Sequence, residues 1–525
     1  MHNDNDMDQL CINTIRTLSM DAVQQANSGH PGTPMAMAPV AYCLWQRFLR
    51  YDPEHPFWPN RDRFVLSMGH ASALLYSLLH LAGVHAVDKD GNVLKRLSVE
   101  LEDLKKFRQL DGVCPGHPEH GLTSGVETTT GPLGQGAANS VGMAIAGTWK
   151  AGFYNRPSFD LFDYDVYALC SDGDMMEGIS GEAASIAGHL GLSNLCWIYD
   201  DNKISIEGST SLTFSEDVAS RFKGYGWRVI RVKDANDLKM LARAFRQFKN
   251  THDRPTLIIV NSHIAFGSPN KQDTAAAHGE PLGEDEIRLT KRNYGWQEDA
   301  KFLVPDGVRE HFRTGIARRG RRLHKKWGKQ LDEYRNRYPG QAGLLDSILN
   351  SRLPEGWDAD LPSFPPDAKG LASRASSGKV LNAIARNVPW LMGGSADLAP
   401  STKTLLTFEE AGGDFSAANP AGRNFHFGIR EHAMGGVLNG MALSGLRPYG
   451  ATFLIFSDYA RPSIRLGALM EIPVIYIFTH DSISVGEDGP THQPIEHLAS
   501  LRAMPHLITI RPADANEVTL DRGTG

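Results

Sequence analysis

The sequence predicts an α/β protein built from two doubly wound, mostly parallel sheets. Short apolar runs, such as residues 166–170 and 195–199, are typical of buried parallel strands. Segments rich in small residues and compatible with helix separate these runs, and turns rich in glycine and aspartate end them. A chain of 525 residues also exceeds the size at which one hydrophobic core stops growing, so more than one such domain is expected.

Composition is that of a globular protein and gives no sign of a nucleic-acid or membrane partner. Apolar residues make up 41% and charged residues 22% of the chain, and the net charge is -6. Five scattered cysteines form no Cys-x-x-Cys pair, which favours reduced thiols over zinc or disulfides. The polar start MHNDNDMDQL is not a signal peptide, and no apolar run reaches the length of a membrane span. We therefore expect a cytoplasmic protein.

The first part of the chain predicts helices separated by loops that carry histidine. A helix over residues 9–28 leads into a Gly-His-Pro-Gly turn with His30. His70 follows a strand-like run and precedes an apolar helix, and His117 lies in a third polar loop. Each of these histidines, taken alone, is more typical of a surface loop than of a catalytic site.

A glycine-rich loop at residues 128–136 opens a helix of small residues at 137–146. Backbone N–H groups at the start of such a helix suit phosphate. The loop has neither a Walker pattern nor GxGxxG, so it does not indicate a nucleotide-binding fold.

The stretch from residue 171 to 204 is the centre of the prediction. A Ser-Asp-Gly-Asp turn follows the strand at 166–170, a helix runs to about Gly191, and the strand at 195–199 leads to Asp201 and Asn202. This β-α-β unit puts Asp172 and Asn202 at the carboxyl ends of neighbouring parallel strands, where open α/β sheets bind ligands. A carboxylate and an amide oxygen suit Mg²⁺, which completes its shell with phosphate and water. By spacing alone, an ordinary β-α-β unit with polar turns fits equally well.

The remainder of the chain predicts a linker and a second α/β unit. A basic run within residues 309–337 is interrupted by acidic and aromatic residues, which favours a solvated helix face over a nucleic-acid site. Proline- and aspartate-rich residues 353–368 indicate a boundary. The predicted domains are therefore 1–335, a linker at 336–368, and 369–525.

Within the second domain, a serine before residue 380 is expected to cap a helix over 380–385, and strands are expected near 390–392 and 472–478. Phe453, Phe456 and Tyr459 recur every three residues, which by spacing alone predicts the buried stripe of a helix.

The ordered set of loop motifs resembles the transketolase family. It begins with SGHPG, GHAS, PGHPE and TGPLGQG and continues through AHGEPLG, FGIREHAM, HDSI and EDGPTHQ. Between them lies a thiamine-diphosphate motif, in which Ser171-Asp-Gly stands for the usual Gly-Asp-Gly and Asp201-Asn202 for Asn-Asn. Ala265 also departs from the usual glycine. The resemblance covers nearly the whole chain.

This resemblance implies thiamine diphosphate with Mg²⁺ or Ca²⁺ as cofactors. Domain 1–335 would bind the diphosphate, and domain 369–525, which we expect to be truncated at its C-terminal end, would bind the pyrimidine. The implied metal ligands are Asp172, Asn202 and the backbone carbonyl of Ile204. Glu431 would pair with the aminopyrimidine ring nitrogen, and Glu177 and Glu182 match carboxylates that face it across the family's dimer interface. The implied cofactor-binding residues are His70, Gly131, Leu133, Gly173, Glu177, Asn202, His278, Glu431, Phe453, Phe456 and Tyr459.

The resemblance also assigns the sugar chemistry. The implied catalytic residues are Glu431, His30, His70, His117, His278 and His480. The implied substrate-binding residues are His30, His117, His278, Arg374, Ser395, His480, Asp488 and His492. Arg374 and Ser395 match part of the site for the terminal phosphate of the sugar, an anion that arginine binds well.

The implied function is reversible transfer of a two-carbon ketol unit from a ketose phosphate to an aldose phosphate, through a thiamine-diphosphate carbanion. It would serve the pentose phosphate pathway or the Calvin cycle in a homodimer with shared active sites. Two alternatives stay open: a related ketol transferase of the dihydroxyacetone synthase or deoxyxylulose-phosphate synthase type, and a truncated cofactor-binding dimer with weak or no activity. Transketolases continue beyond residues 511–518 into a strand and a C-terminal domain. We expect this chain to lack that domain, and residues 519–525 not to continue the helix.

Overall fold

The computed structural model describes residues 4–523, which form two compact units. The first unit contains the residues up to Ser140 together with Tyr164–Gln330. The second contains Val141–Asp163 together with the residues from Leu331 onward. The division falls inside two helices, α5 (Gln135–Tyr154) and α12 (Arg318–Arg337). The domain limits given by the sequence remain a prediction.

The first unit is organised around a parallel sheet with strand order β1-β4-β5-β7-β6. Every residue of β4 and β5 is buried, as the apolar runs predict. The register pairs Cys170 with Tyr199, so the carboxyl ends of these two strands lie side by side. The strands are β1 (Arg63–Leu66), β4 (Val166–Cys170), β5 (Leu195–Asp201), β6 (Arg228–Val232) and β7 (Thr256–Asn261).

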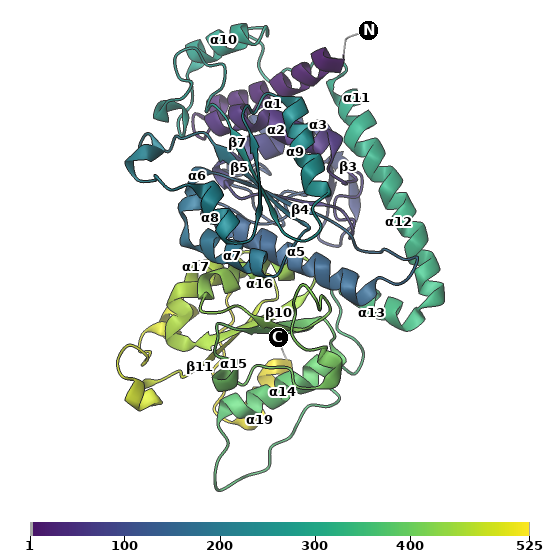
Figure 1. Cartoon of the computed structure of the whole chain (residues 1–525), viewed down its shortest axis with the longest axis vertical. Helices are drawn as coiled ribbons and strands as arrows, with labels where there is room; N and C mark the ends of the chain where they lie inside the picture. Colours follow the sequence, from purple (N-terminus) through teal and green to yellow (C-terminus); the bar gives the residue numbers. More distant parts are fainter. Residues whose placement is uncertain (1–3, 524–525) are drawn as a thin grey trace. The chain divides into compact units, whose positions relative to one another are not determined.

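Helices cover both faces of this sheet, which confirms a doubly wound α/β fold (Figure 1). On one face, Leu169 and Ile198 share a core with α1, α2, α3 and α9. On the other face, the Trp197 indole donates to the Ser140 hydroxyl of α5 at 2.9 Å and packs against Phe222 of α8. These helices are α1 (Asp4–Ala26), α2 (Gly32–Arg47), α3 (Ser72–Ala82), α8 (Val218–Gly224) and α9 (Leu238–Lys249).

The smaller elements of the first unit lie around this framework. They are the antiparallel hairpin β2 (His85–Val87) and β3 (Val93–Leu97), and the helices α4 (Leu101–Lys105), α6 (Asp172–Met176), α7 (Gly178–His189), α10 (Glu284–Asn293) and α11 (Val308–Phe312).

The basic run forms α11, a π-helical turn (Arg313–Ala317) and α12. Arg318, Arg322, Lys325 and Lys326 are exposed, in agreement with a solvated helix face. Arg319 differs, because its guanidinium donates to the carbonyls of Trp45 and Gln46 in the last turn of α2 and of Leu49 just beyond it. Burial lowers the pKa of Arg319 to about 10. This arginine satisfies carbonyls that have no partner within helix α2.

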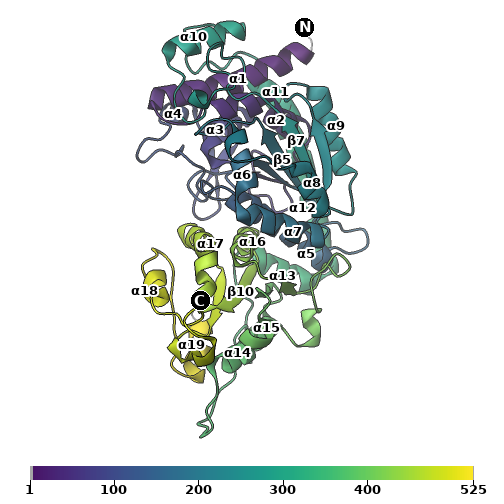
Figure 2. The same cartoon turned by 60° about the vertical axis from the view of Figure 1, so that its left-hand side comes forward.

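The second unit contains a parallel sheet with strand order β11-β10-β8-β9. Figure 2 shows α16 and α17 together beside this sheet, and α16 packs on β10. The strands are β8 (Leu391–Ser395), β9 (Asn424–His426), β10 (Arg447–Phe453) and β11 (Ile475–Thr479). The helices are α13 (Pro339–Leu349), α14 (Ser373–Asn387), α15 (Ala399–Thr402), α16 (Glu431–Leu443), α17 (Ser457–Leu469), α18 (His497–Arg502) and α19 (Ala515–Gly523).

Two predicted helix limits in the second unit are wrong. Helix α14 begins at Ser373, not near residue 380, because the Ser376 hydroxyl donates back to the Ser373 carbonyl and is satisfied inside the helix. Helix α19 continues to Gly523 although the sequence predicted no continuation. It packs against α14, and the Thr519 hydroxyl donates to the Pro362 carbonyl of the linker at 3.2 Å. Tertiary contacts therefore outweigh the weak local helix propensity there.

Within residues 4–523, no helix combines the length and the apolar character needed to cross a membrane.

Helix α5 approaches α16 so closely at Gly142 that no side chain fits between them. A Cβ added there would lie 1.9 Å from the Val437 carbonyl oxygen. We expect Gly142→Ala to lower the free energy of unfolding by about 1–3 kcal/mol, because the two helices must move apart. At Gly328 of α12, a Cβ meets nothing within 4 Å. There the same substitution should raise that free energy by up to about 1 kcal/mol. Urea unfolding followed by circular dichroism compares them, and equal shifts would contradict the packing difference.

Candidate active site

A reciprocal capping box builds the turn that follows β4. The Ser171 hydroxyl accepts the Asp174 N–H at 3.3 Å, and the Asp174 carboxylate accepts the Ser171 N–H at 2.8 Å. Helix α6 therefore begins at Asp172, directly beyond the carboxyl end of the strand. The predicted turn is in fact the first turn of a helix.

Asp172 is buried at this point and faces Tyr199 of the neighbouring strand. The Tyr199 hydroxyl donates to Oδ1 of Asp172. The other carboxylate oxygen, Oδ2, has no hydrogen-bond partner among the residues that the structure describes. Burial raises the pKa of Asp172 to about 6. A buried carboxylate oxygen without a partner is costly for the protein alone, and a bound cation would remove that cost.

Asn202 lies just beyond β5 and is held beside two more carboxylates. Its amide nitrogen donates to Asp200 at 2.8 Å, and its amide oxygen accepts the Ile204 N–H at 2.9 Å. Burial raises the pKa of Asp200 to about 7. Asp201 pairs with the ammonium group of Lys203. The carboxylates of Asp172, Asp200 and Asp201 thus lie at adjacent strand ends, with one ammonium group nearby. Such a set of oxygen ligands fits a divalent cation.

Asp174 is a residue of this site that no motif marked. Its carboxylate is fully buried and also accepts the Ser67 hydroxyl at 2.6 Å and the Gly134 N–H at 2.7 Å. The Ser67 hydroxyl in turn accepts the Ala137 N–H at 2.9 Å. One carboxylate therefore joins the loop before His70, the glycine-rich loop and the Asp172 turn. The Ser-x-x-Asp spacing signals the local cap, but nothing in the sequence signals the two long-range bonds.

The glycine-rich loop lies against the neighbouring loops of the site. A Cβ added at Gly131 would lie 3.5 Å from the His117 ring, and one added at Gly173 would lie 2.6 Å from the Leu133 side chain. The Thr130 hydroxyl donates to the Leu66 carbonyl at 2.8 Å. The structure thus brings Gly131, Leu133 and Gly173 together. Glu177 is exposed and Glu182 is half-buried at the start of α7.

Four of the six predicted histidines form one cluster in the first unit. Ring centroids are 5.1 Å apart for His30 and His70, 5.7 Å for His30 and His278, and 5.2 Å for His70 and His278. His117 lies 6.5 Å from His30. In the chain from residue 4 to 523, the buried Nε2 of His70 and Nδ1 of His278 have no hydrogen-bond partner. These atoms are available to a ligand.

Burial lowers the pKa of all four histidines, for His30 to about 4. Repulsion from His278 and His117 and the charge of Arg108 contribute to this low pKa of His30, after burial. Arg108 donates to the Ser28 hydroxyl at 2.9 Å and lies 3.5 Å from Nδ1 of His30. Near pH 7 the imidazoles are uncharged, so they can accept protons. Arg108 adds the positive charge of this cluster, and no sequence motif marked it.

Glu431 is the first residue of α16 in the second unit, and 6% of it is exposed. The Thr452 hydroxyl donates to its Oε1 at 3.0 Å.

Phe453, Phe456 and Tyr459 form a ladder of nearly parallel rings, with consecutive centroids 6.2 and 6.0 Å apart. They come from the end of β10, a 3-10 turn (Leu454–Phe456) and α17, so the prediction of a helical core stripe is wrong. The chain changes from strand to helix between them, and Tyr459 is 63% exposed. Exposed aromatic faces of this kind suit a flat ring or an apolar partner surface.

His480 and His492 lie against the aromatic ladder. The ring of His480 is 3.8 Å from that of Phe453, and the ring of His492 is 5.3 Å from that of Phe456. The Arg374 guanidinium lies 3.4 Å from Nε2 of His480. Burial and this positive charge lower the pKa of His480.

Two further predicted site residues, Ser395 and Asp488, also belong to the second unit. Ser395 ends β8, where its hydroxyl accepts the Leu398 N–H at 2.9 Å. Asp488 ends a 3-10 turn (Ile483–Asp488) and acts electrostatically on His480. The six histidines thus form two sets, one in each unit.

The low pKa of His30 predicts a loss of stability in mild acid. The folded protein binds the proton only near pH 4, whereas the unfolded chain binds it near pH 6.5. Protons therefore favour unfolding as the pH falls from 6.5 to 4. We expect the melting temperature to fall over this range, and to fall less in His30→Asn, which has no imidazole. His252→Asn, which changes an exposed histidine of the same unit, should keep the wild-type profile. Identical profiles for wild type and His30→Asn would contradict the assignment.

Two sequence profiles match most of the chain. The family described as transketolase, thiamine diphosphate binding domain, matches residues 7–354. The family described as transketolase, pyrimidine binding domain, matches residues 369–519.

Individual proteins agree with these profiles. The transketolase of Geobacillus stearothermophilus is 53% identical over 512 residues, covering 97% of this chain and 74% of that protein. The transketolase of Bacillus subtilis is 52% identical over 507 residues, covering 96% and 74%. A structure of the Pichia stipitis transketolase in complex with sedoheptulose 7-phosphate matches with a TM-score of 0.94 and 44% identity, covering 99% of this chain and 75% of that one. On this similarity the chain belongs to the transketolase family.

Proposed function

We propose that this chain transfers a two-carbon ketol unit from a ketose phosphate to an aldose phosphate, with thiamine diphosphate and a divalent cation, Mg²⁺ or Ca²⁺, as cofactors. Thiamine diphosphate, when bound, supplies the nucleophilic carbon for breaking and forming the C–C bond. The Pichia stipitis structures contain xylulose 5-phosphate, sedoheptulose 7-phosphate and fructose 6-phosphate, which supports sugar phosphates as substrates here. The observation that carries the cofactor assignment is the unpartnered Oδ2 of buried Asp172.

We assign the cation to Asp172, Asn202 and the carbonyl of Ile204. Asp172 offers one free carboxylate oxygen, and the Asn202 amide oxygen accepts the Ile204 N–H while retaining a second lone pair. A cation would also offset the burial that raises the pKa of Asp172. Gly131, Leu133 and Gly173, in the loops joined by Asp174, would lie along the diphosphate.

Glu431 would share a proton with the aminopyrimidine ring nitrogen. Its Oε1 already accepts the Thr452 hydroxyl, so the carboxyl group is oriented by the protein before any ligand binds. The ladder of Phe453, Phe456 and Tyr459 would stack against the pyrimidine ring.

The histidines would move protons on the sugar hydroxyls. His30, His70, His117 and His278 have lowered pKa values, so they are neutral bases near pH 7. His70 and His278 would also bind the cofactor through their unpartnered nitrogens.

In the second unit, Arg374 and Ser395 would bind the terminal phosphate of the sugar. Arg374 lies beside His480, which suits it to an anion. His480, Asp488 and His492 would bind substrate hydroxyls.

We further propose a homodimer whose active sites use residues of both subunits, as in the family. Ile429 is 81% exposed although Glu431, two residues later, is buried. Tyr459 of the aromatic ladder is exposed as well. Exposed apolar side chains beside a functional carboxylate suit a protein interface. Glu177 and Glu182 of the first unit would face Glu431 of the partner subunit. All five cysteines are free and buried, which supports a reducing compartment such as the cytoplasm. From the family, the enzyme would serve the pentose phosphate pathway or the Calvin cycle.

The reaction is tested with xylulose 5-phosphate as donor and an aldose phosphate as acceptor, in the presence of thiamine diphosphate and Mg²⁺. We expect ketol transfer to the aldose phosphate to exceed transfer to formaldehyde and condensation with pyruvate. Preference for either of these would assign the chain to a sibling activity.

In Glu431→Gln the rate should fall by about 10²–10⁴-fold with cofactor binding retained, because the amide cannot share the proton. The exposed Glu410→Gln serves as a control with wild-type activity. An unchanged rate of exchange of the cofactor C2 proton in Glu431→Gln, measured by NMR, would refute its role.

Removal of the one charged cation ligand should prevent cofactor binding. We expect Asp172→Ala to bind thiamine diphosphate at least 100-fold more weakly in calorimetry with Mg²⁺ present, comparable to wild type with EDTA. Even second-shell changes at metal sites cost about 10–100-fold. Asp253→Ala removes the same charge from the exposed surface of the same unit and should bind normally. Tight, Mg²⁺-dependent binding by Asp172→Ala would disprove the cation assignment.

A further inference from the structure

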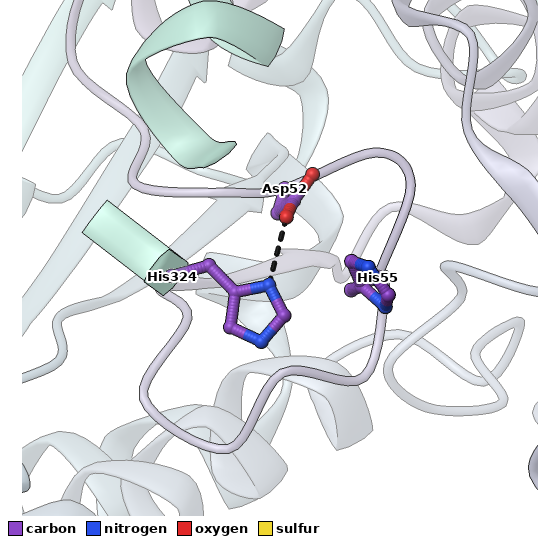
Figure 3. A group of neighbouring side chains, drawn as sticks. All are labelled: Asp52, His55 and His324. Atoms are coloured by element: carbon purple, nitrogen blue, oxygen red, sulfur yellow. Dashed lines mark hydrogen bonds and ion pairs between the residues drawn. The ribbon is translucent and has the colours of Figure 1, made fainter. Parts of the chain in front are cut away.

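We propose that Asp52, His55 and His324 form a second metal site, for a first-row transition ion such as Zn²⁺. Figure 3 shows the three side chains converging from two segments, with Asp52 joined to His324 by a hydrogen bond. Asp52 and His55 lie in the loop between α2 and β1, and His324 lies on α12. These residues have no role in the ketol-transfer site, and this inference does not depend on that site.

The ligand atoms are already close to a coordinating arrangement. One atom from each residue can be chosen so that all three lie within 4.8 Å of one another. Nδ1 of His324 is 2.8 Å from Oδ2 of Asp52, and the rings of His55 and His324 are 4.7 Å apart. Zn–N and Zn–O distances of about 2.0–2.1 Å place tetrahedral ligands roughly 3.3 Å from one another. The exposed His55 side chain would therefore turn inward by about 1.5 Å at most.

The protein fixes the two segments before any ion binds. The buried Asp52 accepts the Glu54 N–H at 3.2 Å, and its carbonyl accepts the His55 N–H at 3.0 Å. These bonds present Asp52 and His55 on one turn. A Cβ added at Gly320 of α12 would lie 1.8 Å from the Tyr51 carbonyl oxygen, so the helix and the loop are in close contact.

Charge and surroundings also suit an ion of this kind. Arg321, three residues before His324 on α12, is paired with Glu54 at 2.6 Å, so its positive charge is offset by that carboxylate. The Trp58 ring packs 5.4 Å from that of His324, which gives the ligands an apolar wall. In the described structure the buried Trp58 indole N–H has no acceptor. A water molecule held by the ion would bring an acceptor into this region.

The donor set determines the class of metal. Two imidazoles and one carboxylate favour Zn²⁺ and similar transition ions, whereas Mg²⁺ and Ca²⁺ prefer oxygen ligands. The exposure of His55 leaves a fourth position to solvent. A bound ion would tie α12 to the loop that leads into β1, the strand followed by Ser67 and His70. It would therefore stabilise the first unit.

Calorimetric titration of ZnCl₂ into the enzyme loaded with thiamine diphosphate and excess Mg²⁺ tests the site. We expect the wild type to bind one more Zn²⁺ than His55→Ala and His324→Gln, or to bind it at least 100-fold more tightly, since even a second-shell partner is worth about 10–100-fold. His252→Ala removes an exposed histidine elsewhere in the unit and should bind like the wild type. Any Zn²⁺ bound by the active-site histidines is common to all four proteins and cancels in the comparison.

Equal stoichiometry and affinity in wild type and His55→Ala would overturn the proposal. His55 is exposed, so its variant decides the question even if His324→Gln does not fold. Anomalous scattering at the zinc edge from a ZnCl₂-soaked crystal gives a second readout. Density between Asp52 and His324 is expected, and density only at other histidines would also overturn the site.

Discussion

The buried carboxylate of Asp174 is the constraint on which the site of the first unit depends. It accepts hydrogen bonds from Ser67, Gly134 and Ser171, which lie on three separate loops. Burial raises its pKa, and these bonds oppose the increase. Loss of any one of these hydrogen bonds would leave a buried carboxylate oxygen without a donor, which costs free energy. The three loops therefore cannot shift independently. The positions of His70, the glycine-rich loop and Asp172 are therefore set together.

Polar groups in the site differ in how fully the protein satisfies them. Asp174 has donors for both of its carboxylate oxygens, which is typical of a group that holds structure together. Asp172, His70 and His278 each keep one buried atom without a partner in the described chain. Such atoms cost stability in the absence of a ligand. This difference is expected of a binding site, in which fully hydrogen-bonded groups hold the loops in place and groups with a free hydrogen-bonding atom face the ligand.

The sequence predicted those parts of the fold in which local chemistry decides the structure. The strands at 166–170 and 195–199 were located to within two residues, because continuous apolar runs suit strands buried on both faces. Local reasoning failed where tertiary contacts decide. The start of α14 depends on whether a serine caps or continues a helix, and the ring ladder from Phe453 to Tyr459 imitates helical spacing across a strand-to-helix turn. The Ser-x-x-Asp spacing marks Asp174 as a local cap, but its bonds to Ser67 and Gly134 join residues distant in the sequence, as does the contact of Arg108 with His30. No spacing rule predicts these long-range contacts.

The site residues are divided between the two units, with four histidines and Asp172 in one and Glu431, the aromatic ladder and two histidines in the other. If the active sites form only in the proposed homodimer, the activity per chain depends on the enzyme concentration as well as on the sequence. Below the dissociation constant of the dimer, the rate would fall with the square of the enzyme concentration rather than linearly. A cofactor that binds only the assembled site would shift the equilibrium towards the dimer by mass action. Thiamine diphosphate would then act on quaternary structure as well as on chemistry.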